Sequence, residues 1–231
     1  MRSAIVGVTA ACVLAGAVAG ATGQTGKRLA CVGNSITAGS GYVELLDGLV
    51  DSVYDVGNYG SPGACVLRNA DQYGGDGPYW ETASFGRVFG DQPHAITIML
   101  GTNDSKAANW DAHGGEFLRD YAALVDTFAT IGTVEAIYVC LPPPCFDPAC
   151  CGIRPAVVND SIVPLIDSLA RRRGLPLIDC HTRLLDCPQY FLDGVHPNGA
   201  GATAIAKAID TALTCTPVRQ TDAPNPGDAP A

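Results

Sequence analysis

The chain has few basic residues and little charge of any kind. Only 14 of its 231 residues are Lys or Arg, against 23 Asp and Glu, so the formal net charge is −9. Nucleic-acid binding needs clustered basic side chains, and the one tight basic run, Arg171 to Arg173, is typical of the solvated end of a helix. Hydrophobic residues make up 47% of the chain and charged ones 16%, which excludes a disordered chain. We therefore expect one globular domain with no nucleic-acid partner.

The chain has only one long apolar stretch, which lies at its start. This stretch runs from Ala4 to Ala21, follows Arg2 and precedes the polar segment from Gln24 to Arg28. A basic start, a short apolar middle and small residues before a polar flank predict a signal peptide over residues 1–23. A membrane anchor is the alternative, but the stretch is rich in Ala and Gly rather than Leu. We expect a secreted protein, extracellular or periplasmic, with no stable membrane span once mature.

Cysteine is not scarce. Cleavage of the leader leaves nine of the ten cysteines, which is more than a reducing compartment usually tolerates and favours disulfides after export. Because nine is odd, at least one thiol stays free or pairs with another chain. A metal site is the alternative, but the paired C-x₂-C spacing of zinc sites is missing, so no metal and no other cofactor is expected. The cysteines expected to stiffen two late loops are Cys145, Cys150, Cys151, Cys180 and Cys187.

Apolar runs and helix-like segments alternate along the chain. The runs are continuous rather than alternating, as in strands covered on both faces, and they span residues 29–32, 53–56, 95–100, 134–141 and 175–178. Segments with helical spacing span residues 43–50, 115–131, 157–173 and 200–213. The pattern predicts a single α/β domain over residues 24–215, with a five-stranded parallel sheet between helices. The Pro-rich segment 216–231 is predicted to be disordered.

Polar residues that could carry chemistry follow these apolar runs. In an open parallel sheet, ligands bind beyond the carboxyl ends of the strands. Ser35 follows the first run, Gly60 the second and Asn103 the third, while Asp193 and His196 come after the fifth. These residues include a nucleophile, a base with an orienting acid, and hydrogen-bond donors for an oxyanion. Together they are the parts of an acyl-transfer site.

These residues define four sequence blocks, around Ser35, Gly60, Asn103 and the Asp193–His196 pair. In these blocks and their order, the chain resembles the SGNH hydrolases of the GDSL esterase and lipase superfamily over about residues 28–213. The resemblance implies a flavodoxin-like three-layer sandwich and a serine esterase. It implies that Ser35 is the nucleophile, that His196 is the base and that Asp193 orients it. It also implies an oxyanion hole made by the backbone N–H groups of Ser35 and Gly60 and the side-chain amide of Asn103.

One position departs from the superfamily pattern, and it bears on the substrate. Asn34 stands where the family name records an Asp, a replacement that a carbohydrate-esterase subgroup tolerates. The stretches from Leu100 to Lys106 and from Pro78 to Trp80 are similar to ones in exported carbohydrate O-acetylesterases. The resemblance implies a short acyl ester, acetyl above all, on a carbohydrate. Trp80, Trp110 and Tyr79 are candidates for an aromatic rim that stacks on sugar faces, with ordinary packing as the alternative.

Two other functions remain open from the sequence. The same machinery could serve a lysophospholipase or a thioesterase, although the chain has no long apolar lid segment that would cover a lipid site. A secreted carbohydrate-binding protein could keep the fold and lose the chemistry, but none of the five block residues is missing. We therefore expect a secreted carboxylic ester hydrolase whose partner is a small-molecule or polysaccharide ester.

Overall fold

The computed structural model describes residues 26–50, 52–71 and 77–215. The predicted signal peptide at 1–23 and the predicted disordered tail at 216–231 lie outside these residues. Within the described part of the chain, no helix combines the length and the apolar character that a membrane crossing requires.

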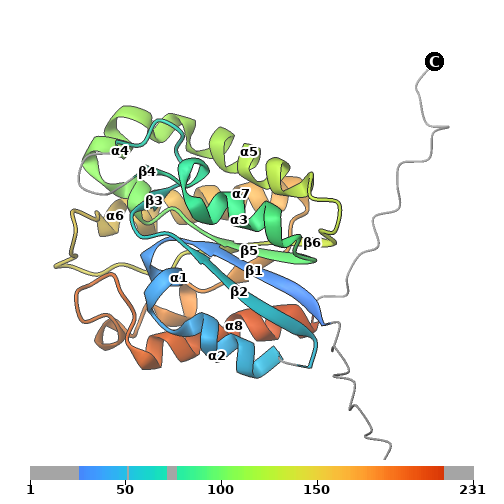
Figure 1. The fold of residues 1–231 in the computed structure, drawn as a ribbon. Coiled ribbons are helices and arrows are strands. Elements are labelled where there is room, and N and C mark those ends of the chain that lie inside the picture. Colours follow the sequence, from blue (N-terminus) through green and yellow to red (C-terminus); the bar gives the residue numbers. More distant parts are fainter. Residues whose placement is uncertain (1–25, 51, 72–76, 216–231) are drawn as a thin grey trace, which may run out of the picture.

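Five parallel strands form a central sheet in the order β2-β1-β5-β6-β7 (Figure 1). Each apolar run that was predicted to be a strand overlaps one of them, with ends that differ by a few residues, so the five-stranded parallel sheet is confirmed. The strands are β1 (Lys27–Gly33), β2 (Tyr54–Gly60), β5 (Ala95–Met99), β6 (Ala136–Leu141) and β7 (Leu177–Asp179). In register, Gly33 lies opposite both Gly60 and Met99, so the carboxyl ends of three strands meet at one edge of the sheet.

Helices cover both faces of this sheet, with α3, α5 and α7 on one face and α2 and α8 on the other (Figure 1). The structure is therefore the three-layer α/β sandwich that was expected. Its helices are α1 (Ser35–Gly39), α2 (Tyr42–Val50), α3 (Ala83–Asp91), α4 (Ala107–His113), α5 (Phe117–Ala129), α6 (Pro155–Val157), α7 (Val163–Arg173) and α8 (Gly199–Cys215). A π-helical turn, Val158–Ile162, joins α6 to α7, and a second small sheet pairs β3 (Ala64–Cys65) with β4 (Gly77–Pro78).

The central strand β5 shows why its apolar run is continuous. Successive side chains of a strand point to opposite faces, so both faces need apolar residues when both are covered. Ile96 and Ile98 belong to the core beneath α3, α5 and α7, whereas Met99 belongs to the core beneath α2 and α8. All five residues of β5 are buried. The sheet is thus a rigid layer that fixes the positions of the residues following each strand.

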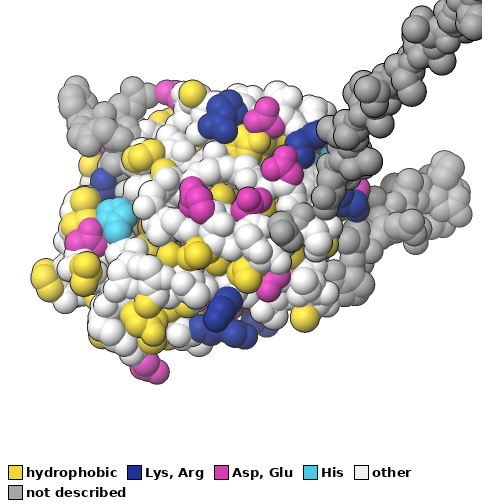
Figure 2. All heavy atoms as spheres, turned by 60° about the horizontal axis from the view of Figure 1, so that its bottom comes forward, with side chains coloured by type: hydrophobic (Ala, Val, Ile, Leu, Met, Phe, Trp, Pro, Cys, Tyr) yellow, Lys and Arg dark blue, Asp and Glu magenta, His cyan; other side chains and the backbone are white. Residues whose placement is uncertain are grey.

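The outer face of α2 and α8 carries a mixture of side chains (Figure 2). Apolar side chains are dispersed there among acidic and basic ones, and Leu45 and Leu49 of α2 are 44% and 46% exposed. Scattered exposed apolar residues of this kind are ordinary on a soluble domain.

Candidate active site

Ser35 lies at the junction between the central sheet and the short helix α1. It directly follows the end of β1 at Gly33-Asn34 and is the first residue of α1. The Asn34 side chain is buried, and its Oδ1 accepts the N–H of Ile36 at 3.0 Å, which caps the helix. Because one amide oxygen is enough for this cap, asparagine holds the turn without the carboxylate that the superfamily name records.

Gly60 ends β2 directly beside this turn. Its N–H donates to Asn58 Oδ1 at 3.0 Å, while Asn58 Nδ2 donates to Thr37 O at 3.0 Å, so Asn58 ties the end of β2 to α1. A Cβ atom at position 60 would lie 2.3 Å from the backbone nitrogen of Ala38. Glycine is thus required here because two backbones approach closely.

The replacement of Gly60 by alanine is expected to destabilise the protein. Because the new Cβ would meet backbone rather than a flexible side chain, the contact can be relieved only by shifting α1, at a cost of about 1–3 kcal/mol in the free energy of unfolding. Urea denaturation measures this loss. The matched control is Gly39→Ala in α1, where a Cβ would meet nothing within 4 Å. Equal free energies of unfolding of the two variants would contradict the close approach of the backbones at Gly60 and Ala38.

Asn103 lies just beyond the end of β5, in a 3₁₀ turn over Asn103–Ser105. Its Nδ2 donates to Ala64 O at 3.1 Å, and its own carbonyl accepts from Asn109 Nδ2 at 3.1 Å. Since an amide nitrogen carries two hydrogens, one N–H of the Asn103 side chain remains available to a ligand. The side chain is nevertheless 6% exposed, so its orientation is fixed by the surrounding protein.

Gly63 is a further backbone donor near this edge that sequence reasoning missed, since Ser61, two residues before it, donates its N–H to Gly33 O at 2.9 Å. Ser61, Pro62, Gly63 and Ala64 form a turn closed by the bond from Ala64 N–H to Ser61 O at 3.1 Å, and Gly63 has φ of 77°. Among the described residues, no acceptor takes the N–H of Gly63. The signal was present in the sequence, because Pro followed by Gly predicts a type II turn whose third residue needs positive φ.

His196 and Asp193 reach the same edge from the loop before α8. Ser35 Oγ lies 2.8 Å from His196 Nε2, and His196 Nδ1 lies 2.8 Å from Asp193 Oδ2. The other oxygen, Asp193 Oδ1, accepts the N–H groups of Val195 at 2.9 Å and His196 at 2.7 Å. The structure therefore brings Ser35, His196 and Asp193 into one continuous chain of hydrogen bonds, although Ser35 and His196 are 161 positions apart.

These contacts keep the Asp193 carboxyl ionised. Burial alone would raise its pKa, but the donors around it outweigh burial, chiefly the N–H of His196, the imidazole of His196 and the N–H of Val195. The net result is a pKa well below the usual range of an Asp. An ionised Asp193 accepts the Nδ1 proton of His196, so the Nε2 lone pair faces the Ser35 hydroxyl.

Hydrogen bonds, rather than disulfides, hold the two late loops together. All nine cysteines in the described residues are free thiols, so the expected cross-links through Cys145, Cys150, Cys151, Cys180 and Cys187 are a prediction that the structure does not bear out. Phe146 N–H donates to Gly194 O at 2.9 Å, and Cys150 N–H donates to Asp193 O at 2.9 Å. The loop after β6 is thereby joined directly to the loop that carries Asp193 and His196.

The aromatic residues proposed as a sugar-binding rim do not behave alike. The prediction that Tyr79 belongs to this rim is wrong, because Tyr79 is fully buried and its hydroxyl donates to Tyr59 O at 2.8 Å. Trp80 is partly exposed, but its Nε1 donates to Val66 O at 3.1 Å and the Arg68 guanidinium lies 3.7 Å from the centre of its ring. Trp110 is also partly exposed and packs against Phe117. Trp80 and Trp110 therefore remain candidates, although both also serve as packing residues.

A cavity on the described structure lies away from these residues. It has a volume of about 500 Å³, and its lining includes Arg28 at the start of β1, Asp55 at the start of β2, and Tyr59 and Asp91. Arg28 and Asp55 lie at the amino ends of their strands, opposite the edge where Ser35 and His196 meet. This cavity contains none of the residues that were predicted to form the site.

Asp104, beside Asn103, anchors the loop that follows the turn at Gly63. Its carboxylate accepts the N–H groups of Val66 and Leu67, both at 2.9 Å. Burial raises its pKa to about 7 despite these donors, and the nearby carboxylate of Asp120 adds to the shift. The folded protein therefore holds a proton on Asp104 at pH values where the unfolded chain has lost it.

The stability of the protein is expected to depend on pH through Asp104. Since its folded pKa lies above the usual value of 3.8, the stabilising contribution of the protonated form is full below about pH 4 and is lost as pH rises through about 7. Relative to Asp104→Asn, which cannot titrate, the wild type should lose free energy of unfolding over this range. Urea midpoints from pH 4 to 8 measure the difference. Asp186→Asn, at an exposed position, is the control and should show the same pH dependence as the wild type. If the free energy of unfolding of Asp104→Asn changed with pH as that of the wild type does, the assignment to Asp104 would be refuted.

The fold and the sequence together identify the family to which the chain belongs. Residues 31–204 match the model of the GDSL-like Lipase/Acylhydrolase family. The chain belongs to this family, as the four sequence blocks predicted. It is similar to an acetylxylan esterase of Xylanibacter ruminicola, with 32% identity over 212 residues and 80% of this chain covered. The chain spans only 43% of the length of that relative.

Solved structures show the same fold. An α/β hydrolase from the metagenome of Lake Arreo is 25% identical with a TM-score of 0.60, covering 82% of this chain and 96% of its own. An acetylxylan esterase from Geobacillus stearothermophilus is 20% identical with a TM-score of 0.60, covering 81% and 94% respectively. A lipase/acylhydrolase from Enterococcus faecalis is 17% identical with a TM-score of 0.62, covering 83% and 98%. The three-layer sandwich is thus common to this chain and these hydrolases.

Proposed function

We propose that the protein is an exported carboxylic ester hydrolase that removes acetyl or other short acyl groups from carbohydrate through an acyl-enzyme on Ser35. The observation that carries this proposal is the chain of 2.8 Å hydrogen bonds from Asp193 through His196 to Ser35. A serine hydroxyl becomes a useful nucleophile only beside a base, and that base must be held in the correct tautomer. Family membership supports acyl-ester chemistry at this site.

In the first half of the reaction, Ser35 Oγ attacks the ester carbonyl carbon while His196 Nε2 takes the hydroxyl proton. The imidazolium that forms is stabilised by the ionised Asp193 carboxylate. When the tetrahedral intermediate collapses, His196 returns the proton to the leaving alcohol and the acyl group stays on Ser35. In the second half, water attacks the acyl-enzyme with His196 again as base, and the acid and free Ser35 are released.

The negative charge on the carbonyl oxygen is stabilised by N–H donors at the same edge of the sheet. Ser35 N–H and the free N–H of the Asn103 amide are two of the three donors predicted from sequence. The third, Gly60 N–H, is occupied by Asn58 Oδ1. We assign its place to the N–H of Gly63, which lies in the turn directly after β2 and has no acceptor among the described residues. One such donor contributes about 2.7–4 kcal/mol to transition-state stabilisation in other serine hydrolases.

The proposed substrate class is supported by two relatives and by two partly exposed aromatic side chains. Both the Xylanibacter relative and the Geobacillus neighbour are described as acetylxylan esterases, which act on an acetylated polysaccharide. The partly exposed Trp80 and Trp110 provide aromatic surface on which sugar faces stack. Export is part of this proposal because of the expected signal peptide at residues 1–23, and it would bring the enzyme to extracellular polysaccharide.

Activity measured against acyl chain length tests this proposal. Hydrolysis of p-nitrophenyl acetate, butyrate and octanoate is compared with acetate release from acetylated xylan. We expect kcat/KM to fall as the acyl chain lengthens. We also expect acetate to be released from acetylated xylan. A preference for octanoate would favour the lysophospholipase or thioesterase alternative. Binding to xylan without hydrolysis of any ester would favour the non-catalytic carbohydrate-binding alternative.

A further inference from the structure

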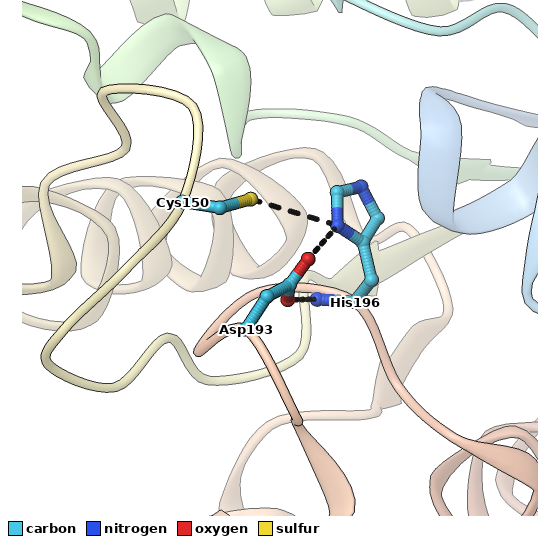
Figure 3. A group of neighbouring side chains, drawn as sticks. All are labelled: Cys150, Asp193 and His196. Carbon is cyan, nitrogen blue, oxygen red and sulfur yellow. Dashed lines mark hydrogen bonds and ion pairs between the residues drawn. The ribbon is translucent and has the colours of Figure 1, made fainter.

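A thiol that the proposed reaction does not use lies against the His196–Asp193 pair. Cys150 Sγ is 3.7 Å from His196 Nδ1 (Figure 3), whereas Ser35 Oγ lies at the other ring nitrogen, Nε2. The same thiol lies within 4.8 Å of a carboxylate oxygen of Asp193. The Cys150 backbone is fixed by its N–H bond to Asp193 O at 2.9 Å. The loop after β6 therefore presents this thiol to the base and its orienting acid in a defined position.

The three side chains together have the composition and spacing of a metal site. Cys150 Sγ, His196 Nδ1 and an Asp193 carboxylate oxygen all lie within 4.8 Å of one another. Thiolate, imidazole and carboxylate are the ligands that Zn²⁺ takes in proteins, and tetrahedral zinc with ordinary bond lengths separates sulfur from nitrogen by about 3.6 Å. The separation of 3.7 Å between Cys150 and His196 matches this geometry.

The site also has the access and freedom that an incoming ion needs. The side chains of His196 and Asp193 are 37% and 41% exposed, and Cys150 is partly exposed, so an ion can approach from solvent. The bond from Nδ1 to Asp193 Oδ2, now 2.8 Å, would open by about 0.5 Å to reach the nitrogen–oxygen separation of tetrahedral zinc. Water would complete the fourth position.

We propose that Cys150, Asp193 and His196 form an inhibitory site for Zn²⁺ that switches the esterase off. This inference rests on the proposed function, since it uses His196 as the base. On binding, the Cys150 thiol releases its proton to solvent, and the ring proton of His196 passes through water from Nδ1 to Nε2 as the metal occupies Nδ1. One proton is released in total, and the ring stays neutral.

Inhibition follows from the proton on Nε2. In the free enzyme, the lone pair of Nε2 faces Ser35 Oγ at 2.8 Å and can take its proton. In the zinc-bound enzyme, Nε2–H would donate to Ser35 Oγ instead, so the nucleophile has no base. The Asp193 carboxylate is engaged by the metal at the same time and no longer orients the ring.

The experiment is a ZnCl₂ titration of p-nitrophenyl acetate hydrolysis in a non-chelating buffer. The protein is first reduced and desalted, because Cys151 Sγ lies 2.8 Å from Cys150 Sγ and oxidation of the pair would consume the thiol. We expect at least a tenfold loss of activity that EDTA reverses. Inhibition of each variant is expressed relative to its own activity without metal. In Cys150→Ser, the zinc concentration that gives half inhibition should be at least tenfold higher than in the wild type.

A matched control and a second readout complete the test. Cys151→Ser removes the neighbouring exposed thiol, and it should remain as sensitive to zinc as the wild type. Co²⁺ binding, followed by the thiolate-to-cobalt absorption band, reports the site even if no ester is hydrolysed. The band is expected in the wild type and Cys151→Ser and absent in Cys150→Ser. Equal zinc sensitivity of wild type and Cys150→Ser, or no thiolate band in the wild type, would overturn the site while leaving the esterase proposal standing.

Discussion

Replacement of Ser35 by alanine is expected to lower kcat for p-nitrophenyl acetate by about 10⁴- to 10⁶-fold, the range found when a triad member is removed from a serine hydrolase. The loss is this large because Ser35 Oγ is the atom proposed to form the acyl-enzyme, and among the described residues His196 Nε2, 2.8 Å away, contacts no other hydroxyl. Steady-state hydrolysis measures the effect, and circular dichroism shows whether the variant is folded.

The control for this substitution is Ser52→Ala. Ser52 is exposed and lies in the turn before β2, at the opposite end of this strand from Gly60 and the site. Its replacement should leave both kcat and KM unchanged. A Ser35→Ala enzyme that kept more than about a tenth of wild-type kcat would show that another residue is the nucleophile, since residual catalysis without the nucleophile is orders of magnitude lower.

Replacement of Asp193 by asparagine is the second large effect that we expect. Asparagine keeps an oxygen for the N–H groups of Val195 and His196, so the loop should remain folded. The amide NH₂ would then face His196 Nδ1, which favours the tautomer with its proton on Nε2, and the negative charge that stabilises the imidazolium is lost. In trypsin, the equivalent change of tautomer lowers kcat by about 10⁴-fold.

The size of this loss separates an orienting role from a merely structural one. If Asp193 only held its loop, asparagine would preserve the loop and kcat would change little. Thermal unfolding should therefore change little while kcat falls by orders of magnitude. Asp186→Asn, an exposed acid in the same long loop, should behave as the wild type in both measurements. A fall in stability that accounts for all of the lost activity would contradict the orienting role.

The fold was predictable because its signals are local and strong. The run of β5 is apolar on both faces, which only a strand between two helical layers requires, and β1 and β6 show the same pattern. The helices at 42–50, 117–129 and 199–215 follow from helical spacing. Short elements such as α1 and α4 were not predicted as helices. Five or seven residues give too little periodicity, and their helical form depends on tertiary contacts.

The site was predictable as a set of residues but not in its details. Ser35, Asn103, Asp193 and His196 follow strands whose carboxyl ends must meet, so the sequence contains the reason for their convergence. That the N–H of Gly60 is occupied depends on which way the Asn58 side chain turns, which no spacing reveals.

Other features depend on contacts between distant segments. Burial of Tyr79 results from its packing beneath α3 and α5, and Cys150 meets His196 only because two loops pair through their backbones. The expectation of disulfides came from counting cysteines, and a count carries no information about which sulfur atoms meet. Such features are properties of the folded chain, and the structure was needed to find them.

The measurement that most directly tests the account is covalent labelling with a fluorophosphonate, which reacts with a serine activated by a base. The account predicts one label per wild-type molecule, located on Ser35 by peptide mass spectrometry, and no label on Ser35→Ala. Labelling of Asp193→Asn should be strongly slowed, because His196 would be in the wrong tautomer. Labelling of Ser35→Ala at the wild-type rate, or a label on any other residue, would contradict the claim that Ser35 is the nucleophile.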